Sequence, residues 1–107
     1  MAISLVRHTE TIASTVGATT DGQKWKVDGH FFELQILVAP VNFTIRVSMD
    51  GVNWITGTDA DAAGLTALGA GVYRIARERP EWVQAQVAAD AAGPQNCIWV
   101  LGVHKVI

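Results

Sequence analysis

Apolar and polar residues alternate with a period of two along several segments, the pattern of a β-strand that buries one face. Segment 42–49 places four apolar side chains on one face: Phe43, Ile45, Val47 and Met49. Segment 82–89 directs Gln84 and Gln86 outward and four apolar side chains inward: Val83, Ala85, Val87 and Ala89. We therefore predict that both segments are strands that pack on a common core.

Asp-Gly steps mark the predicted turns, because both residue types tolerate the positive φ that tight turns require. Asp50-Gly51 directly follows the first strand, and residues 52–56 return as its partner. Residues 43–56 are therefore expected to form a hairpin. Asp21-Gly22 and Asp28-Gly29 predict turns on either side of a short strand over 24–27.

Further strands are predicted at 30–38, 71–76 and 96–107, the first and last with apolar residues on both faces. The N-terminal residues alternate loosely and fit either a first strand or an extended arm on a neighbouring molecule. The chain thus divides into 1–22, a strand or arm, and a domain over 23–107. Seven or eight short strands favour an all-β antiparallel β-sandwich, jelly-roll-like, with a five-stranded barrel as the alternative.

Between the predicted strands, residues 57–71 form a loop of about fifteen residues in which 61–68 has room for a helical turn or two. Asp59 and Asp61 lie in it, but the further oxygen ligands that Ca²⁺ requires do not follow. The three histidines, His8, His30 and His104, are far apart in the sequence, and Cys97 lies among apolar residues. We therefore expect no catalytic residue, metal or cofactor, and assign the protein to the non-enzymes.

Charge is scarce in this chain. Charged residues make up 17% of the 107 residues, against about a quarter in typical domains. Part of the surface is therefore expected to be covered in the working state, by copies of the chain or by a larger partner. The net charge of −2 gives no attraction for nucleic acid. No apolar stretch is long enough for a membrane span, and no secretory signal is expected.

Four segments have a distinctive sequence and order along the chain: FTIRVSMDGVNWI at 43–55, GVYRI at 71–75, PEWVQAQV at 80–87 and IWVLG at 98–102. Together they resemble small β-sandwich virion proteins of tailed bacteriophages, particularly capsid decoration (cement) proteins. The resemblance implies a structural protein of the virion that binds the outside of the capsid. Its expected partners are copies of itself, as a homotrimer, and the major capsid protein, with no nucleic acid and no membrane.

Four residues are predicted to make the protein contacts that this role requires. Ile3, Leu5 and Val6 are expected to touch the capsid or a neighbour. Trp82 shares its face with two glutamines, so we expect it outside the core as an interface anchor. Two other functions remain open: a tail or baseplate structural protein, and a carbohydrate-binding module that stacks exposed tryptophans on sugars.

Overall fold

The computed structural model describes residues 3–13, 19–38, 43–58, 63–66, 68–74, 79–87 and 96–106. These residues form eight strands and no helix. The strands are β1 (Ile3–Ala13), β2 (Thr20–Lys26), β3 (Phe31–Val38), β4 (Phe43–Ser48), β5 (Ile55–Thr56), β6 (Gly71–Arg74), β7 (Trp82–Val87) and β8 (Asn96–Val106). The described residues include no helix able to cross a membrane.

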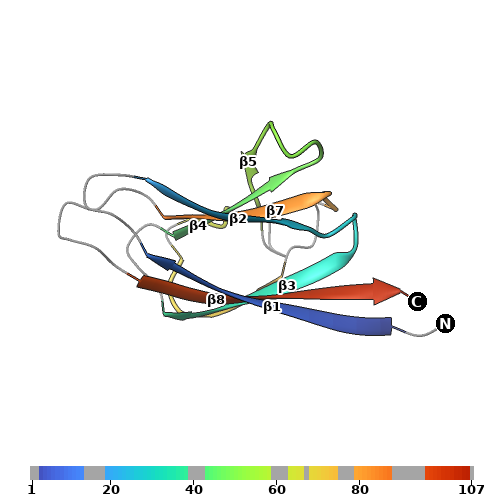
Figure 1. The fold of residues 1–107 in the computed structure, drawn as a ribbon, viewed down its shortest axis with the longest axis horizontal. Helices are drawn as coiled ribbons and strands as arrows, with labels where there is room; N and C mark the ends of the chain where they lie inside the picture. Colours follow the sequence, from blue (N-terminus) through green and yellow to red (C-terminus); the bar gives the residue numbers. More distant parts are fainter. Residues whose placement is uncertain are drawn as a thin grey trace.

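The strands form two packed antiparallel sheets (Figure 1). The first sheet has the order β1-β8-β3-β6 and the second the order β2-β7-β4-β5. First and last strands therefore pair, as do β2 with β7, β3 with β6 and β4 with β5. This is the pairing of a jelly roll. The prediction of an all-β sandwich with seven or eight strands is confirmed, and the barrel alternative is wrong.

β8 is an interior strand of the first sheet, as expected for a strand with apolar residues on both faces. It pairs with β1 from Ile3 opposite Val106 to Ala13 opposite Asn96, and with β3 on its other side. The N-terminal residues described here therefore form a strand of the first sheet. The core lies between the two sheets and contains the buried side chains of Ile12, Val27, Phe32, Leu34, Ile36, Phe43, Ile45, Val47, Leu65, Val83, Ala85, Val87, Cys97, Trp99, Leu101 and Val103.

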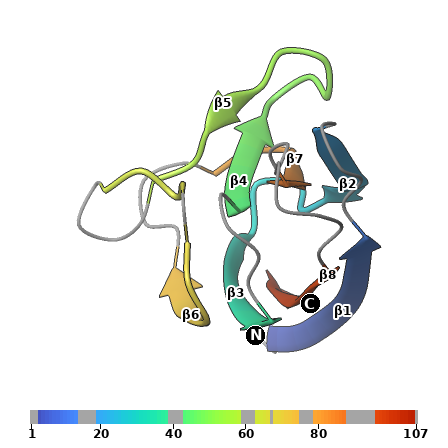
Figure 2. The same cartoon turned by 90° about the vertical axis from the view of Figure 1, so that its left-hand side faces the viewer.

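On one side of the sandwich, β1 of the first sheet lies against β2 of the second (Figure 2). The ring of His8 stacks on Trp25, with ring centroids 4.5 Å apart. Gly22 permits this approach, because a Cβ there would lie only 2.7 Å from Oε1 of Glu10. Asp21-Gly22 is therefore part of β2, at an irregularity in its pairing with β7, and the predicted turn at this step is wrong. The turn at Asp28-Gly29 is confirmed, with positive φ at both residues.

The hairpin over 43–56 is present but is wider than predicted. Val47 pairs with Ile55, so the strand expected over 52–56 is reduced to Ile55–Thr56. Phe43, Ile45 and Val47 are buried as expected, whereas Met49 is 67% exposed because it lies in the turn beyond the strand. The longer turn projects its apolar residues into solvent instead of the core.

The segment 57–71 is partly built into the second sheet. Leu65 is 1% exposed and belongs to the core. Its backbone carbonyl accepts a hydrogen bond from the backbone N of Ile45, and its backbone N donates to the carbonyl of Gly57. The residues around Leu65 therefore lie beside β4, and the described residues of 61–68 form no helical turn. Asp59 and Asp61 lie outside the described residues.

Candidate interaction surface

The outer face of the second sheet is polar, and its polar groups bind one another. Gln84 is only 6% exposed although it points away from the core. Its Oε1 accepts a hydrogen bond from Arg46 at 3.1 Å, and its Nε2 donates to the carbonyl of Gly22 at 3.0 Å. Gln86 Nε2 donates to Asp21 Oδ1 at 2.9 Å. This face therefore has few unsatisfied groups to offer a partner.

The tryptophans are held by neighbours within the chain. Trp99 is fully buried and Trp25, Trp54 and Trp82 are half-buried. The guanidinium of Arg46 lies 5.3 Å from the ring centroid of Trp54, and the ammonium of Lys26 lies 5.7 Å from that of Trp82. These cation–π contacts occupy ring surface that a sugar would need for stacking. The geometry thus gives no support to the carbohydrate-binding alternative.

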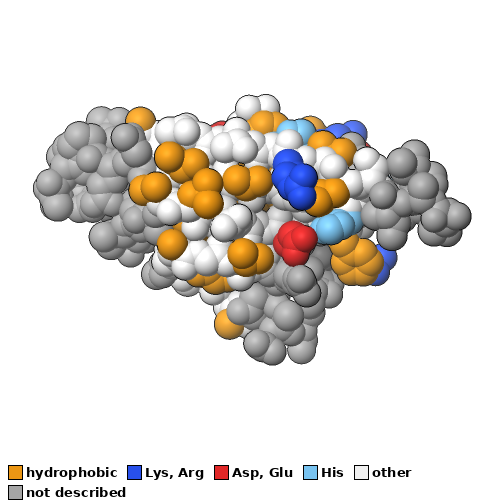
Figure 3. All heavy atoms as spheres, turned by 90° about the horizontal axis from the view of Figure 1, so that it is seen from below, with side chains coloured by type: hydrophobic (Ala, Val, Ile, Leu, Met, Phe, Trp, Pro, Cys, Tyr) orange, Lys and Arg blue, Asp and Glu red, His pale blue; other side chains and the backbone are white. Residues whose placement is uncertain are grey.

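The outer face of the first sheet has a different character. Hydrophobic side chains gather over part of it, with a basic, an acidic and a histidine side chain beside them (Figure 3). Leu5 of β1 is 38% exposed, and Val72 of β6 is 62% exposed. Between them β8 contributes the half-buried Ile98 and Val100. The contrast with the hydrogen-bonded second sheet makes this face the best candidate for a protein contact.

A hollow of about 230 Å³ lies in the middle of this face. Its floor includes Gly102, which has no side chain to fill the space between the flanking strands. Arg7 borders the hollow from β1 and Glu33 borders it from β3. Glu33 Oε1 lies 2.9 Å from Nε2 of His104 on β8. The hollow therefore has a cation on one side and a carboxylate on the other.

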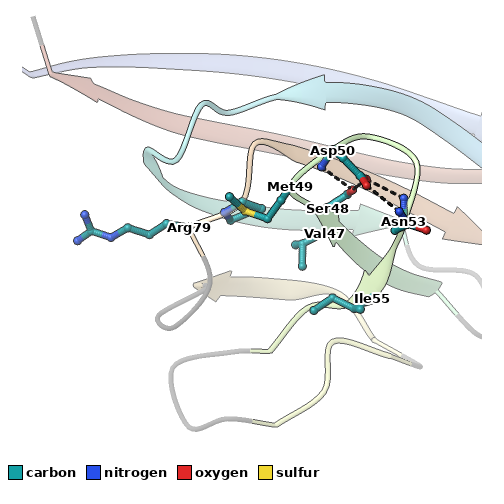
Figure 4. Close-up of a pocket in the computed structure, with 8 residues that line it drawn as sticks. Val47, Ser48, Met49, Asp50, Asn53, Ile55 and Arg79 are labelled. Atoms are coloured by element: carbon teal, nitrogen blue, oxygen red, sulfur yellow. Dashed lines mark hydrogen bonds between the residues drawn. The ribbon is translucent and has the colours of Figure 1, made fainter.

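A second feature is the turn between β4 and β5, which is organised by one carboxylate (Figure 4). Asp50 Oδ1 accepts hydrogen bonds from the backbone N of Asn53 and of Val52, both at 2.8 Å, and Asp50 Oδ2 accepts one from Asn53 Nδ2 at 2.7 Å. Ser48 Oγ donates to Asp50 Oδ1 at 2.9 Å. The backbone donors at Asn53 and Val52 contribute most to holding the pKa of Asp50 well below its usual range.

A cavity of about 320 Å³ lies beside this turn. Its walls are largely apolar and include Val47, Met49 and Ile55 (Figure 4). Arg79 also lines it, but its guanidinium lies over the ring of Phe31, 4.1 Å from the centroid. The described part of the cavity therefore offers apolar contact, without a pair of groups placed for acid and base chemistry.

The predicted contact residues lie on two different sheets. Leu5 is exposed on the outer face of the first sheet. Val6 is half-buried opposite Val103, a core residue, so it lies on the inner face of β1. Ile3 begins β1, and its side chain lies outside the described residues. Trp82 is half-buried at the start of β7 on the outer face of the second sheet, so the structure does not bring it to Leu5.

The other candidate groups serve the fold. Among the residues that the structure describes, no three His, Cys, Asp or Glu side chains lie close enough to hold a metal ion. Cys97 is buried. Burial, together with the nearby carboxylate of Glu10, raises the pKa of the Cys97 thiol to about 12. The thiol therefore stays protonated and unreactive at neutral pH.

Apart from Leu5, the members of the apolar face were not predicted from the sequence. The signal was present in part, because segment 96–107 reads as apolar on both faces and Ile98 and Val100 are its outward residues. The contribution of Val72 depends on the pairing of β6 with β3, which no local pattern specifies.

No protein-family profile matches the chain, and no curated protein matches it by sequence. Two solved structures share its fold. YomS, a protein derived from the SPBc2 prophage, has a TM-score of 0.56 and 12% identity over 92% of this chain and 95% of its own. A chain of Bacillus endospore appendages, which form disulfide-linked pili, has a TM-score of 0.51 and 14% identity over 100% of this chain and 92% of its own. At such identities the likeness establishes the fold.

Proposed function

We propose that this chain is a non-enzymatic structural protein of a bacteriophage particle, which binds the outside of the capsid as an oligomer and stabilises the shell. The observation that carries the proposal is the difference between the two outer faces. The second sheet satisfies its polar groups internally, and among the described residues its large exposed apolar side chains are confined to the β4–β5 hairpin, whereas the outer face of the first sheet leaves Leu5 and Val72 exposed beside Val100. An apolar face on a charge-poor chain is suited to permanent contact with other subunits.

The structural neighbours support an assembly role. One derives from a prophage, and the other belongs to Bacillus endospore appendages, which form pili. The appendage pili are disulfide-linked, but here the single cysteine, Cys97, is buried and its thiol has a pKa of about 12. We therefore expect assembly of this chain not to use disulfide links through Cys97.

The resemblance of the sequence to decoration proteins gives the finer proposal: a homotrimer on the capsid surface, with the major capsid protein as partner. A subunit that binds only the assembled shell stabilises it by mass action. Linking three such contacts in one oligomer raises the avidity further. No enzymatic role is proposed, because the described acidic groups such as Glu10, Glu33 and Asp50 are engaged in internal hydrogen bonds.

Particles of the phage whose genome encodes the chain provide the test. An antibody against the chain, visualised by gold labelling in electron microscopy, is expected to decorate the head. Shells stripped of the chain should break at lower temperature and recover when purified chain is added back. Label confined to the tail would instead support the tail or baseplate alternative. Absence of the chain from purified particles would contradict a virion role altogether.

A further inference from the structure

Arg7, Gly102 and Glu33 lie in one row across the first sheet. Arg7 pairs with Gly102 between β1 and β8, and Gly102 pairs with Glu33 between β8 and β3. Directly opposite residues of neighbouring strands point to the same face. The cation and the carboxylate therefore have the same position along the strand direction. They lie on opposite sides of β8, with the hollow between them.

The two charges differ in their engagement within the chain. Arg7 is exposed and takes part in no ion pair among the described residues. Glu33 is half-buried, contacts His104 and lies opposite Arg74 of β6 in the same row, so its carboxylate is already engaged within the chain. The arginine therefore has its charge available for a carboxylate outside the chain.

This arrangement becomes self-complementary under one symmetry operation. A half-turn about an axis that runs along β8, just outside the face, places β1 of one copy over β3 of the other. This rotation leaves the position of each residue along the strand direction unchanged. Arg7 of each copy therefore faces Glu33 of the other. Both ion pairs form at once, because a two-fold contact is isologous. A half-turn about an axis across the strands at this level would instead set Arg7 against Arg7.

The neighbouring rows fit the same rotation. In one of them Leu5, His104 and Phe31 are opposite one another, so Leu5 of each copy would face Phe31 of the other. Leu5 is 38% exposed and Phe31 is 53% exposed, with the guanidinium of Arg79 over one side of the Phe31 ring. In the other row Thr9, Val100 and Gln35 are opposite one another, so Thr9 of each copy would face Gln35 of the other, and Val100, on the axis, would face its own equivalent. The ion pairs would therefore have an apolar contact on the Leu5 side, which shields them from water there, and a polar contact on the other side.

The size of the face fits a weak, reversible contact. Only β1, β8 and β3 overlap about this axis, and they have 11, 11 and 8 residues. At a rise of about 3.3 Å per residue and a spacing of about 4.8 Å, these three strands give a face of roughly 480 Å². A pair of faces would bury about 950 Å², which lies in the range of transient contacts, below the roughly 1,200 Å² at which stable interfaces begin. Two stacked sheets also keep their strands nearly aligned, as this axis requires.

We infer that the outer face of the first sheet binds a second copy of this chain, about a two-fold axis along β8, through reciprocal Arg7–Glu33 pairs. The inference rests on the proposed function and specifies one of its contacts. Because a two-fold contact joins copies in pairs, it is separate from any three-fold contact at the capsid.

Charge exchange tests the pairing. In the Arg7→Glu variant, the carboxylate at position 7 of each copy faces the carboxylate of Glu33 of the other copy. In the Glu33→Arg variant, two guanidinium groups face each other in the same way. Each variant alone is expected to self-associate about ten- to a hundred-fold more weakly than the original chain in sedimentation equilibrium. An equimolar mixture should recover the affinity, because both pairs are then complementary. Lys26→Glu, on the outer face of the second sheet, serves as the control and should leave self-association unchanged.

A second pair of variants covers the case in which Glu33→Arg fails to fold. Val100→Glu and Val100→Lys each place like charges together on the axis, and only their mixture should pair. Self-association that is unaffected by the single variants, mixtures that do not recover, or an original chain that stays monomeric at millimolar concentration would each overturn the inference. Gold labelling of phage heads is a separate measurement, so a chain that labels heads but fails these tests would retain its proposed function.

Discussion

Glu10 and Trp99 are joined across the first sheet by a hydrogen bond of 2.9 Å between Oε1 and the indole Nε1, although 89 positions separate them in the chain. The other oxygen of Glu10 accepts a hydrogen bond of 2.7 Å from the backbone N of Gln23. One carboxylate on β1 thus binds both β8 of its own sheet and β2 of the other. It is a tie between the two layers at the side where β1 approaches β2.

Glu10→Ala should therefore destabilise the fold by about 1–3 kcal/mol, because Trp99 is fully buried and its indole N–H would lose its partner. Urea unfolding followed by tryptophan fluorescence measures the change. Thr11→Ala is the matched control: Thr11 is the next residue of β1 and is exposed, so its loss should change stability by less than about 0.5 kcal/mol. Equal losses of stability in the two variants would contradict the role of Glu10 in joining the two sheets.

The turn after β4 should weaken in acid. Because the pKa of Asp50 is lower in the folded chain than in the unfolded chain, its contribution is present above the unfolded value near 4 and is lost as the pH falls toward the folded value. Asp50→Asn should consequently lower the melting temperature at pH 7, and the difference from the original chain should shrink toward pH 2. Asp28→Asn, in the other Asp-Gly turn, controls for the change in charge. A difference that does not vary with pH would contradict this role of the carboxylate.

Cys97 should be inert in the folded protein. A disulfide reagent such as dithionitrobenzoate is expected to label it only after denaturation, whereas Thr11→Cys should add one thiol that reacts in the native state. The thiol pKa of about 12 in the folded chain exceeds the unfolded value near 8.5. Stability from this group is therefore complete below about pH 8.5 and decreases as the pH rises above it. Rapid native labelling of Cys97 would show that the thiol is accessible.

Leu5 and Trp82 separate the two outer faces experimentally. Leu5→Asp should weaken self-association at least about tenfold, because a carboxylate would replace an apolar contact on the first sheet.

Trp82→Ala tests the predicted anchor on the second sheet. It should also lower stability by about 1–2 kcal/mol, since the indole packs against Gly51 and lies near Lys26. Sedimentation and thermal melting distinguish the effects, and an oligomer that survives Trp82→Ala would remove Trp82 from the contact.

Local patterns were sufficient for the strands that bury one face. Alternation predicted Phe43, Ile45 and Val47 as core residues, and Val83 and Val87 likewise, because successive side chains of a strand point to opposite sides. The same reasoning failed for Gln84, which points outward as predicted but is covered by Arg46 and β2. Alternation specifies a direction, whereas burial depends on what lies in that direction.

The apolar face could be anticipated only in part. The composition predicted that some surface is covered, and the two-sided pattern of 96–107 pointed to β8. Neither could place Arg7 opposite Glu33 across Gly102, because that row requires the registers of two strand pairs at once.

The sequence by itself determined an all-β chain, the positions of most of its strands and the scarcity of charge, since these follow from side-chain periodicity and composition. Only the tertiary structure decided that the first strand pairs with the last, that Leu65 enters the core and that Glu10 binds Trp99. These relationships join residues distant in the chain. They are set by the packing of two sheets, in which each contact depends on the placement of all the strands.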